Sequence, residues 1–350
     1  MEQLVVAGGG VIGLTCAWRA AQAGFRVTLC DPDPTAGSSW VAGGMLAPVT
    51  EAWPGEEALL ELGLESVARW PDFAAELAAE GRDPGLQSAG TVVAATGTGD
   101  RAELDALAEH LARLGRPVDR LTGRELRRLE PALGPDVRGG LSVPADLSVD
   151  NRTLLDALRV AVEKAGVVVE ARAYAGEPAD QLLICAGAHS AALHPALAGL
   201  VRPVKGEILR LAHRRGAFPV PGRTIRALVD GRPVYLVPRS AGLVVGATQS
   251  EQGFDTEPTV GGVRDLLRDA ERIVPGIAEY GLVEVAAGLR PGSPDNVPLI
   301  GRLDEHTVVA TGHSRNGILL APLTAELVVG VVRGRPVPAA VEPGRFERHT

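Results

Sequence analysis

Residues 4–13, Leu-Val-Val-Ala-Gly-Gly-Gly-Val-Ile-Gly, decide the fold of this 350-residue chain. The apolar run Leu4–Ala7 predicts a buried strand, and the glycines that follow it stand at the spacing G-x-G-x-x-G. In such a turn Gly8 permits the sharp change of direction, and Gly10 lets a pyrophosphate approach the backbone without meeting a Cβ atom. Gly13 lets the next helix pack close to the strand. The stretch therefore predicts a phosphate-binding turn.

A helix and a second strand are expected directly after this turn. Residues 14–22 have an Ala-rich helical pattern, and the β-like run at residues 26–30 leads into Asp31. The N-terminus of the helix offers N–H groups to a phosphate, and the Asp31 carboxylate can accept hydrogen bonds from an adenosine ribose. This order predicts a dinucleotide site, with a glycine-rich turn that binds nothing as the simpler alternative. The motif alone does not distinguish NAD from FAD.

Composition excludes several classes of protein. Hydrophobic residues make up 45% and charged residues 22% of the chain, which is typical of a globular protein of one or two domains. A net charge of −8 argues against a nucleic-acid surface. We see no apolar run of membrane-spanning length and no signal peptide, and expect a cytoplasmic protein. Cys16, Cys30 and Cys185 lie in apolar stretches without metal-ligand spacing, so we expect buried thiols, no disulfide and no metal.

The remainder of the chain predicts an α/β fold with an insertion. The α/β pattern resumes at Asp150, which precedes a helix to Lys164. Short β-like runs separated by Gly, Pro and Arg fill residues 206–248 and predict an inserted antiparallel-sheet α+β domain, whereas residues 134–144 read as loop. The predicted Rossmann-like nucleotide-binding domain comprises residues 1–85, 141–201 and 288–350, and the predicted substrate domain comprises residues 86–140 and 202–287.

A second glycine turn, Thr311–Gly317, opens a C-terminal helix at residues 318–333. Its N-terminus is a second site that stabilises negative charge. An NAD enzyme has no use for such a site. A flavin does, because reduction builds negative charge at the N1–C2 edge of the ring, and the second turn therefore favours FAD.

Seven motifs resemble the D-amino-acid-oxidase superfamily of FAD enzymes, and within it the glycine oxidase branch. They span nearly the whole chain, and the last two are the most specific. The motifs are VVAGGGVIGL at 5–14, AGGML at 42–46, RPVKGE at 202–207, YLVPR at 235–239, VVGAT at 244–248, GLRPGSPDNVPLIG at 288–301 and GHSRNGILLAP at 312–322.

The resemblance implies a set of residues that bind FAD without a covalent bond. One segment lies along the pyrophosphate and the isoalloxazine ring, and a later one closes over the flavin with its helix N-terminus. The implied cofactor-binding residues are Gly8, Gly10, Val11, Ile12, Gly13, Asp31, Ser38, Ser39, Gly43, Gly44, Met45, Gly187, His313, Ser314, Asn316, Gly317, Ile318 and Leu319.

The resemblance also implies the substrate site. Arg290 matches an arginine that grips the substrate carboxylate, Arg315 matches a second arginine at that site, and Tyr235 matches a tyrosine that lines the pocket. A guanidinium–carboxylate pair would orient the α-carbon hydrogen toward the flavin, so hydride transfer needs no catalytic residue from the protein. With oxygen as acceptor, glycine would give glyoxylate, ammonia and hydrogen peroxide. Arg315 could instead pair with an acid between domains.

Two departures from the family keep the substrate open. The region between Val169 and Leu182 is too short for the family's usual hairpin, so no adenine contact is placed there. Val234 and Gln249, beside the pocket motifs, do not match the glycine oxidase pattern, which keeps an N-substituted glycine alongside glycine. Glycine would suggest thiazole formation for thiamine, and a larger substrate would suggest a tailoring step in a biosynthetic pathway.

Three alternatives for function remain at this stage. A D-amino acid oxidase and a sarcosine oxidase belong to the same superfamily, although the absence of cysteine beyond Cys185 argues against the covalent sarcosine type. A flavin-binding module without turnover is the third, and Arg290 argues against it because such a module needs no carboxylate clamp. A small-molecule substrate and oxygen are the expected partners, with a homo-oligomer possible.

Overall fold

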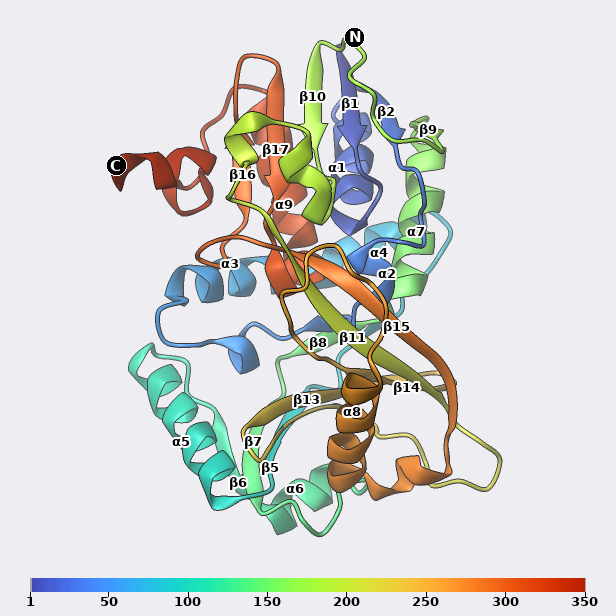
Figure 1. Ribbon diagram of the computed structural model, residues 1–350, viewed down its shortest axis with the longest axis vertical. Coiled ribbons are helices and arrows are strands. Elements are labelled where there is room, and N and C mark those ends of the chain that lie inside the picture. Colours follow the sequence, from blue (N-terminus) through green and yellow to red (C-terminus); the bar gives the residue numbers. More distant parts are fainter. Residues whose placement is uncertain (1, 350) are drawn as a thin grey trace.

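The computed structural model describes residues 2–349, and side chains through residue 346. A six-stranded sheet holds the predicted strand and glycine turn at its centre (Figure 1). In spatial order its strands are β16 (Leu299–Arg302), β17 (Thr307–Thr311), β10 (Gln181–Ile184), β1 (Gln3–Ala7), β2 (Arg26–Cys30) and β9 (Val168–Glu170). All neighbours run parallel except β16, which pairs antiparallel with β17. The predicted βαβ unit is therefore confirmed.

Helices lie on one side of this first sheet, some packed on its strands and others packed mainly on neighbouring helices. They are α1 (Val11–Gln22), α2 (Ser38–Val41), α3 (Glu57–Val67), α4 (Trp70–Ala79), α7 (Asn151–Lys164) and α9 (Gly317–Val332). α1 begins directly after the glycine turn and contacts both α7 and α9, so these three helices form the main apolar core with the strands. Leu197 and Val201 pack on the opposite face of the sheet, against Ile184 and Val309.

Helix α9 corrects one expectation from the sequence. Residues Ser314–Val332 are long and apolar enough to cross a membrane by length and composition, with a mean hydropathy of 1.4. However, 72% of that stretch is buried inside the protein, where α9 packs on α1 and α3. Its apolar character on all sides is therefore explained by burial in the core.

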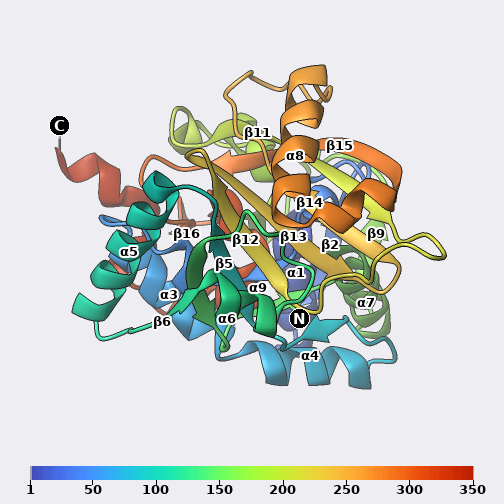
Figure 2. The same ribbon diagram turned by 90° about the horizontal axis from the view of Figure 1, so that it is seen from below.

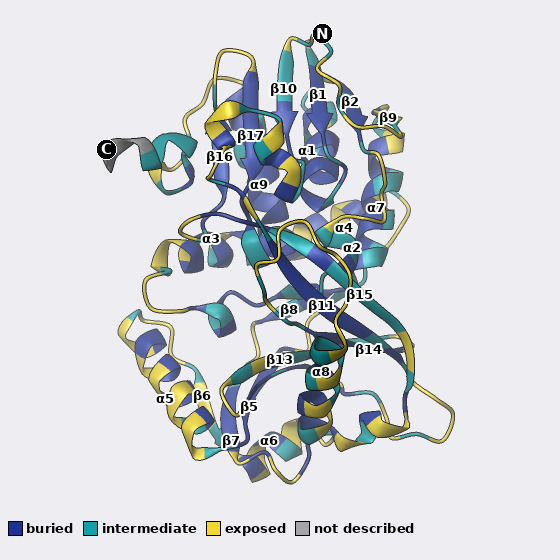
Figure 3. Cartoon of the chain, viewed as in Figure 1, coloured by how far each residue is buried: buried dark blue, intermediate teal, exposed yellow. Residues whose placement is uncertain are grey.

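A second, eight-stranded sheet lies below the first in Figure 1, and Figure 2 shows the same arrangement from below. Its strands, in spatial order, are β15 (Gly281–Gly292), β11 (Arg202–Ala212), β14 (Gly242–Gly246), β13 (Arg232–Arg239), β12 (Thr224–Val229), β5 (Thr91–Ala95), β7 (Gly139–Val143) and β6 (Asp119–Thr122). Helix α8 (Val260–Ile273) packs on one face through Leu266 and Ala270. α5 (Thr98–Arg113) and α6 (Gly123–Leu129) lie beside β5, β6 and β7, and α5 has an exposed outer side (Figure 3).

The second sheet differs from its prediction in two ways. It is largely antiparallel, but β5 and β12 pair in parallel, so the sheet is mixed. Residues 139–143, predicted as loop, form β7 between β5 and β6. The glycines and prolines in this stretch suggested a loop, yet Gly140 is a strand residue that lies so close to β5 that a Cβ would come within 1.8 Å of the Val93 carbonyl oxygen.

A small sheet and one long strand connect the two large sheets. β3 (Met45–Leu46), β8 (Leu147–Val149) and β4 (Leu86–Gln87) form the small sheet in the order β3-β8-β4. β15 pairs with β11 along nearly its whole length and then leads back to the first sheet. The predicted domain boundary at residue 288 falls inside β15, and the division into two domains stays a prediction.

Candidate cofactor and substrate site

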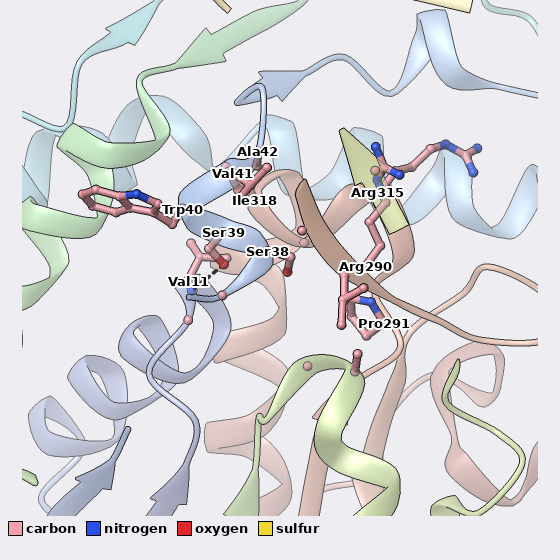
Figure 4. Close-up of a pocket in the computed structure, with 18 of the residues that line it drawn as sticks. Val11, Ser38, Ser39, Trp40, Val41, Ala42, Arg290, Pro291, Arg315 and Ile318 are labelled. Atoms are coloured by element: carbon pink, nitrogen blue, oxygen red, sulfur yellow. Dashed lines mark hydrogen bonds between the residues drawn. The ribbon is translucent and has the colours of Figure 1, made fainter. Parts of the chain in front are cut away.

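One continuous cavity of about 1440 Å³ lies between the first and second sheets. It extends from Cys30 and Asp31, at the end of β2, to Arg290 in β15. Small-molecule sites usually occupy about 300–1000 Å³, so this cavity is large enough for a dinucleotide together with a small substrate. In Figure 4, Val11 and the two serines of α2 lie toward one side, and the side chains of Arg290 and Arg315 lie toward the other.

The glycine turn at the start of α1 forms one wall. Gly8 has a φ of +109°, and a Cβ there would come within 2.5 Å of the Cys185 carbonyl oxygen. A Cβ on Gly13 would come within 1.8 Å of the Gly8 carbonyl oxygen, so Gly13 permits close packing and does not itself line the cavity. Gly10 offers no side chain to cap α1. N–H groups at this helix end therefore remain available to an anion.

Two side chains next to the turn complete the nucleotide end. Ser39 Oγ accepts a hydrogen bond from the Val11 N–H at 3.1 Å, drawn as a dashed line in Figure 4. Asp31 lines the cavity, and a Cβ on Gly9 would come within 2.5 Å of its Oδ2 atom. Burial raises the pKa of the Asp31 carboxyl, while backbone hydrogen bonds from Asp33 and Gly9 oppose this rise. Gly9 was missed by the sequence analysis because the motif leaves its position variable.

The segment from α2 to β3 forms a second wall. Asn151 holds α2 in place, since its Nδ2 donates to the carbonyl oxygens of Ser39 and Trp40 at 2.9 Å each. Gly44 has a φ of +75°, and a Cβ on Gly43 would come within 2.7 Å of the Tyr235 ring. The segment can therefore pass close to the second sheet. Of the predicted cofactor residues in this segment, Ser38, Ser39, Gly43, Gly44 and Met45 all line the cavity.

The turn before α9 forms a third wall. His313, Ser314, Asn316, Gly317 and Ile318 line the cavity, as does Gly187 from the turn after β10. The predicted residue Leu319 does not line it: its carbonyl oxygen accepts hydrogen bonds from Ser66 and Trp70 inside the core. α9, like α1, begins without a side-chain cap. A second helix N-terminus thus points to the cavity.

His313 is a neutral structural residue. It is buried, and its Nε2 atom lies 3.0 Å from Thr324 Oγ1. Burial lowers the pKa of His313 to about 3, so its ring is neutral at neutral pH and keeps a single N–H. The imidazole therefore packs beneath the turn and has no role as an acid.

Residues after β9 close the nucleotide end, where the sequence analysis placed no contact. Ala173 and Tyr174 line the cavity. The Tyr174 hydroxyl donates to the Glu177 carbonyl oxygen at 3.0 Å, and Arg172 forms ion pairs with Glu170 and Glu177. The sequence of this segment is too short for the family's usual hairpin. In the structure the short segment is held by these contacts of its own and still lines the cavity.

Arg290 and Tyr235 meet at the substrate end over two glycines. A Cβ on Gly206 would come within 2.3 Å of Arg290 Nη1, and a Cβ on Gly246 would come within 2.3 Å of the Tyr235 hydroxyl. Since β11 and β14 are neighbours in the sheet, the two side chains lie over adjacent strands. Among residues 2–349, Arg290 donates only to the Thr248 carbonyl oxygen, at 3.3 Å, and has no carboxylate partner. The site thus contains a guanidinium with donors available to an anion.

Arg315 lies in the same cavity but is held by carboxylates. Its Nε lies 3.0 Å from Glu51 Oε2, and its Nη2 pairs with Glu56. Glu51 also pairs with Arg226 of β12 at 2.6 Å. Burial would raise the pKa of Glu51, but Arg226 and Arg315 outweigh it and hold that pKa below its ordinary value. The predicted role of Arg315 in substrate binding stays a prediction.

Comparison with known proteins agrees with this arrangement of fold and site. Residues 3–330 match the DAO family, described as FAD dependent oxidoreductase. The chain is 32% identical to a glycine oxidase of Geobacillus kaustophilus, over 99% of this chain and 97% of that protein. The crystal structure of glycine oxidase from that organism superposes with a TM-score of 0.85 over 96% of both chains. The chain belongs to the DAO family of FAD dependent oxidoreductases and is glycine oxidase-like.

Two further relatives differ in extent and in substrate. The chain is 31% identical to the bifunctional protein ThiO/ThiG of Trichormus variabilis over 99% of its length, but spans only 55% of that protein. An iminodiacetate oxidase structure from Chelativorans sp. BNC1 shares 26% identity with a TM-score of 0.82, covering 98% of this chain and 99% of that one. Relatives of this fold therefore act on more than one amine.

Proposed function

We propose that this protein is an FAD-dependent amine oxidase that oxidises the Cα–N bond of glycine or an N-substituted glycine. The observation that carries this proposal is Arg290, whose guanidinium has no carboxylate partner among the described residues and lies over Gly206 in the cavity. The Arg290 side chain is partly buried and its fork has open N–H groups, so an anion in the cavity can form a charge-assisted pair with it. A substrate carboxylate would supply this anion.

The residues at the nucleotide end fit FAD. Gly8 and Gly10 leave room at the turn that a Cβ would take up, and the residues before α1 and α9 leave N–H groups of both helices open. Asp31 lines the cavity beside the turn, where it would accept hydrogen bonds from a ribose. Without cysteine beyond Cys185, we propose non-covalent binding. When bound, FAD would supply the hydride acceptor, and oxygen would reoxidise it.

The chain's own residues would orient the substrate, and two titratable side chains that line the cavity are not free to abstract a proton from it. Arg290 would bind the α-carboxylate in a bidentate pair, and the Tyr235 hydroxyl beside it would donate a further hydrogen bond. Burial raises the pKa of Tyr235, so its hydroxyl stays protonated and is a donor. Neither His313, neutral and bonded to Thr324, nor Glu51, paired with two arginines, is free to act as a base. The substrate amine must therefore arrive neutral.

The overall reaction balances with water and oxygen. Glycine, water and oxygen give glyoxylate, ammonia and hydrogen peroxide, and an N-substituted glycine gives the corresponding amine in place of ammonia. The similarity to ThiO/ThiG proteins supports thiazole formation for thiamine as the setting for glycine, and a tailoring step is the alternative for a larger substrate. We propose a cytoplasmic enzyme, with a homo-oligomer possible.

Product analysis tests this function. Purified protein loaded with FAD is incubated in air with glycine, sarcosine, N-ethylglycine or D-alanine, and peroxide, glyoxylate and pyruvate are measured. The proposal predicts equal amounts of peroxide and glyoxylate from the glycines. If D-alanine gives more pyruvate than the glycines give glyoxylate, the protein is instead a D-amino acid oxidase. No peroxide from any substrate would favour a flavin-binding module.

A further inference from the structure

The cavity has a second arginine with free donors, Arg226, on the strand next to Tyr235. Arg226 lies in β12 directly opposite Tyr235 of β13, so both side chains project from the same face of the second sheet. Arg226 and Glu51 both line the cavity, and the Arg226 side chain is 15% exposed. The sequence analysis did not single out either residue.

The hydrogen bonds of this pair leave donors, not acceptors, for a ligand. Arg226 donates through Nη1 to Glu51 Oε1 at 2.6 Å and has no other acceptor among residues 2–349. A guanidinium carries several N–H donors in a planar fork, so part of the fork remains open. By contrast, both carboxylate oxygens of Glu51 are engaged, one by Arg226 and the other by Arg315.

The ion pairs around Arg226 balance one another, and the buried Asp146 carboxyl nearby, whose pKa burial raises to about 7, is largely protonated below that pH. Arg226 and Arg315 are cationic, Glu51 and Glu56 are anionic, and their formal charges cancel.

In the order of the strands, β13 with Tyr235 lies between β12, which carries Arg226, and β11, whose Gly206 lies beneath the Arg290 guanidinium. The site thus offers guanidinium donors on both sides of one tyrosine.

Resting on the proposed function, we propose that Arg226 determines specificity by binding a carboxylate on the substrate's nitrogen substituent, so that the preferred substrate is an N-carboxyalkyl glycine. The simplest member is iminodiacetate. One carboxylate would bind Arg290 and the other Arg226. An apolar N-alkyl group at the same place would remove water from the open N–H groups without replacing its hydrogen bonds, which is unfavourable.

The reaction is balanced for this substrate. Iminodiacetate, oxygen and water give glyoxylate, glycine and hydrogen peroxide. The lone pair of the neutral amine nitrogen would form the C=N bond as a hydride leaves the α-carbon, and FAD, when bound, would be the hydride acceptor. The proton released when the resulting iminium is hydrolysed balances the two protons of hydrogen peroxide. Water adds to that bond and the C–N bond breaks, while oxygen takes up the two electrons as peroxide.

The test compares iminodiacetate with N-isobutylglycine, whose substituent has the same number and branching of non-hydrogen atoms as the carboxymethyl group but is apolar. We expect the wild-type protein to have a higher kcat/KM for iminodiacetate, and Arg226→Met to lower the ratio of the two kcat/KM values by about tenfold or more. Arg226→Lys, which keeps the charge but loses the fork, should give an intermediate ratio. Glu51→Gln, which removes the competing carboxylate, should raise the ratio. A ratio that is unchanged in Arg226→Met would overturn the proposal.

A binding measurement separates this inference from the proposed function. Diglycolate, a dicarboxylate with an ether oxygen in place of the amine, cannot be oxidised at a C–N bond, and methoxyacetate is its monocarboxylate counterpart. If no glycine is oxidised, the proposed function fails. The Arg226 proposal is then tested by titrating each acid and following the change in flavin absorbance. Tighter binding of diglycolate than of methoxyacetate, lost in Arg226→Met, supports the proposal. Equal affinity of the wild-type protein for diglycolate and methoxyacetate overturns it.

Discussion

At the scale of single residues, the central feature is a guanidinium placed over a glycine. Arg290 lies across Gly206, and Tyr235 lies across Gly246, so each side chain occupies the space that a neighbouring Cβ would fill. This packing fixes both groups in the cavity before any ligand arrives. Such preorganisation reduces the entropy lost when a carboxylate binds.

Removing the Arg290 guanidinium should abolish the carboxylate contact. We expect Arg290→Ala to lower kcat/KM for glycines by about 100- to 1000-fold, which corresponds to roughly 3–4 kcal/mol. FAD affinity should change little, because Arg290 lies at the end of the cavity opposite Asp31. Stopped-flow reduction of the flavin and FAD titration of the apoprotein measure the two quantities. A change below threefold in kcat/KM would contradict the assigned role.

The glycine beneath Arg290 allows a subtler test. Gly206→Ala should displace the guanidinium, since its Cβ would come within 2.3 Å of Nη1, and we expect KM for glycines to rise by about tenfold or more. Gly261→Ala in α8 is the matched control, because a Cβ there meets no atom within 4 Å. Steady-state kinetics of both variants measure the effect. Equal KM values in the two variants would show that the recess over Gly206 is unimportant.

At the scale of elements, helix termini organise both ends of the site. The residues that precede α1 and α9 at the cavity provide no side-chain cap, although the first N–H of α1 donates to Ser39 Oγ. By contrast, α7 begins with a side-chain cap from Asp150. Asp150 accepts hydrogen bonds from the N–H groups of Arg152 and Thr153, and its Oδ2 also lies 3.2 Å from Arg239 Nε. Burial lowers the pKa of Arg239 to about 10, and the Asp150 charge opposes this decrease.

Loss of this cap should therefore cost more than loss of an ordinary one. We expect Asp150→Ala to lower the free energy of unfolding by more than the roughly 1 kcal/mol typical of an N-cap, because Arg239 also loses its carboxylate partner. Thr259→Ala, which removes the cap of α8 at Gly262 N–H, is the matched control. Chemical denaturation of both variants gives the difference, and a smaller loss in Asp150→Ala than in Thr259→Ala would refute this explanation.

Elements whose signals are local could be predicted from the sequence. The turn from Gly8 to Gly13, the strand ending before Asp31 and the capped helix after Asp150 each depend on residues close together in the chain. The ion pairs of Glu51 could not be predicted, because Arg226 and Arg315 lie 175 and 264 residues away. An arginine within the apolar run Thr224–Val229 was the only local signal for that pair.

At the scale of the whole molecule, one buried acid, Asp146, contacts residues from distant parts of the chain. Asp146 follows β7 and is 2% exposed, and Thr50 donates a hydrogen bond to it at 3.3 Å. Burial raises the pKa of Asp146 to about 7 from an ordinary value of 3.8. The folded protein therefore keeps this proton over a pH range in which the unfolded chain has released it.

This shift predicts how stability depends on pH. Between about pH 4 and pH 7 the folded state holds more protons, so the Asp146 contribution to stability falls as pH rises and is lost above about pH 7. The full shift is worth about 4 kcal/mol. Asp146→Asn should remove this part of the pH dependence, whereas Asp72→Asn, at an exposed position on α4, should retain it. Urea denaturation from pH 5 to pH 8.5 measures the slopes, and parallel profiles for Asp146→Asn and wild type would contradict the assignment.

At this scale, the residues that we propose to hold the nucleotide, the flavin ring and the substrate lie along one cavity between two sheets. Neither sheet provides this site alone: the first contributes the glycine turn and the helix termini, and the second contributes Arg290 and Tyr235. We propose that a glycine bound at Arg290 would pass a hydride to FAD held by residues at the carboxyl edge of the first sheet.

Anaerobic mixing tests this claim most directly. The FAD-loaded protein is mixed without oxygen with glycine, sarcosine, iminodiacetate or D-alanine. The absorbance at about 450 nm, which reports oxidised flavin, is followed. We predict rapid bleaching by the glycines, much slower bleaching in Arg290→Ala, and recovery of the colour when oxygen is admitted. A flavin that stays oxidised with every glycine would contradict the proposed function.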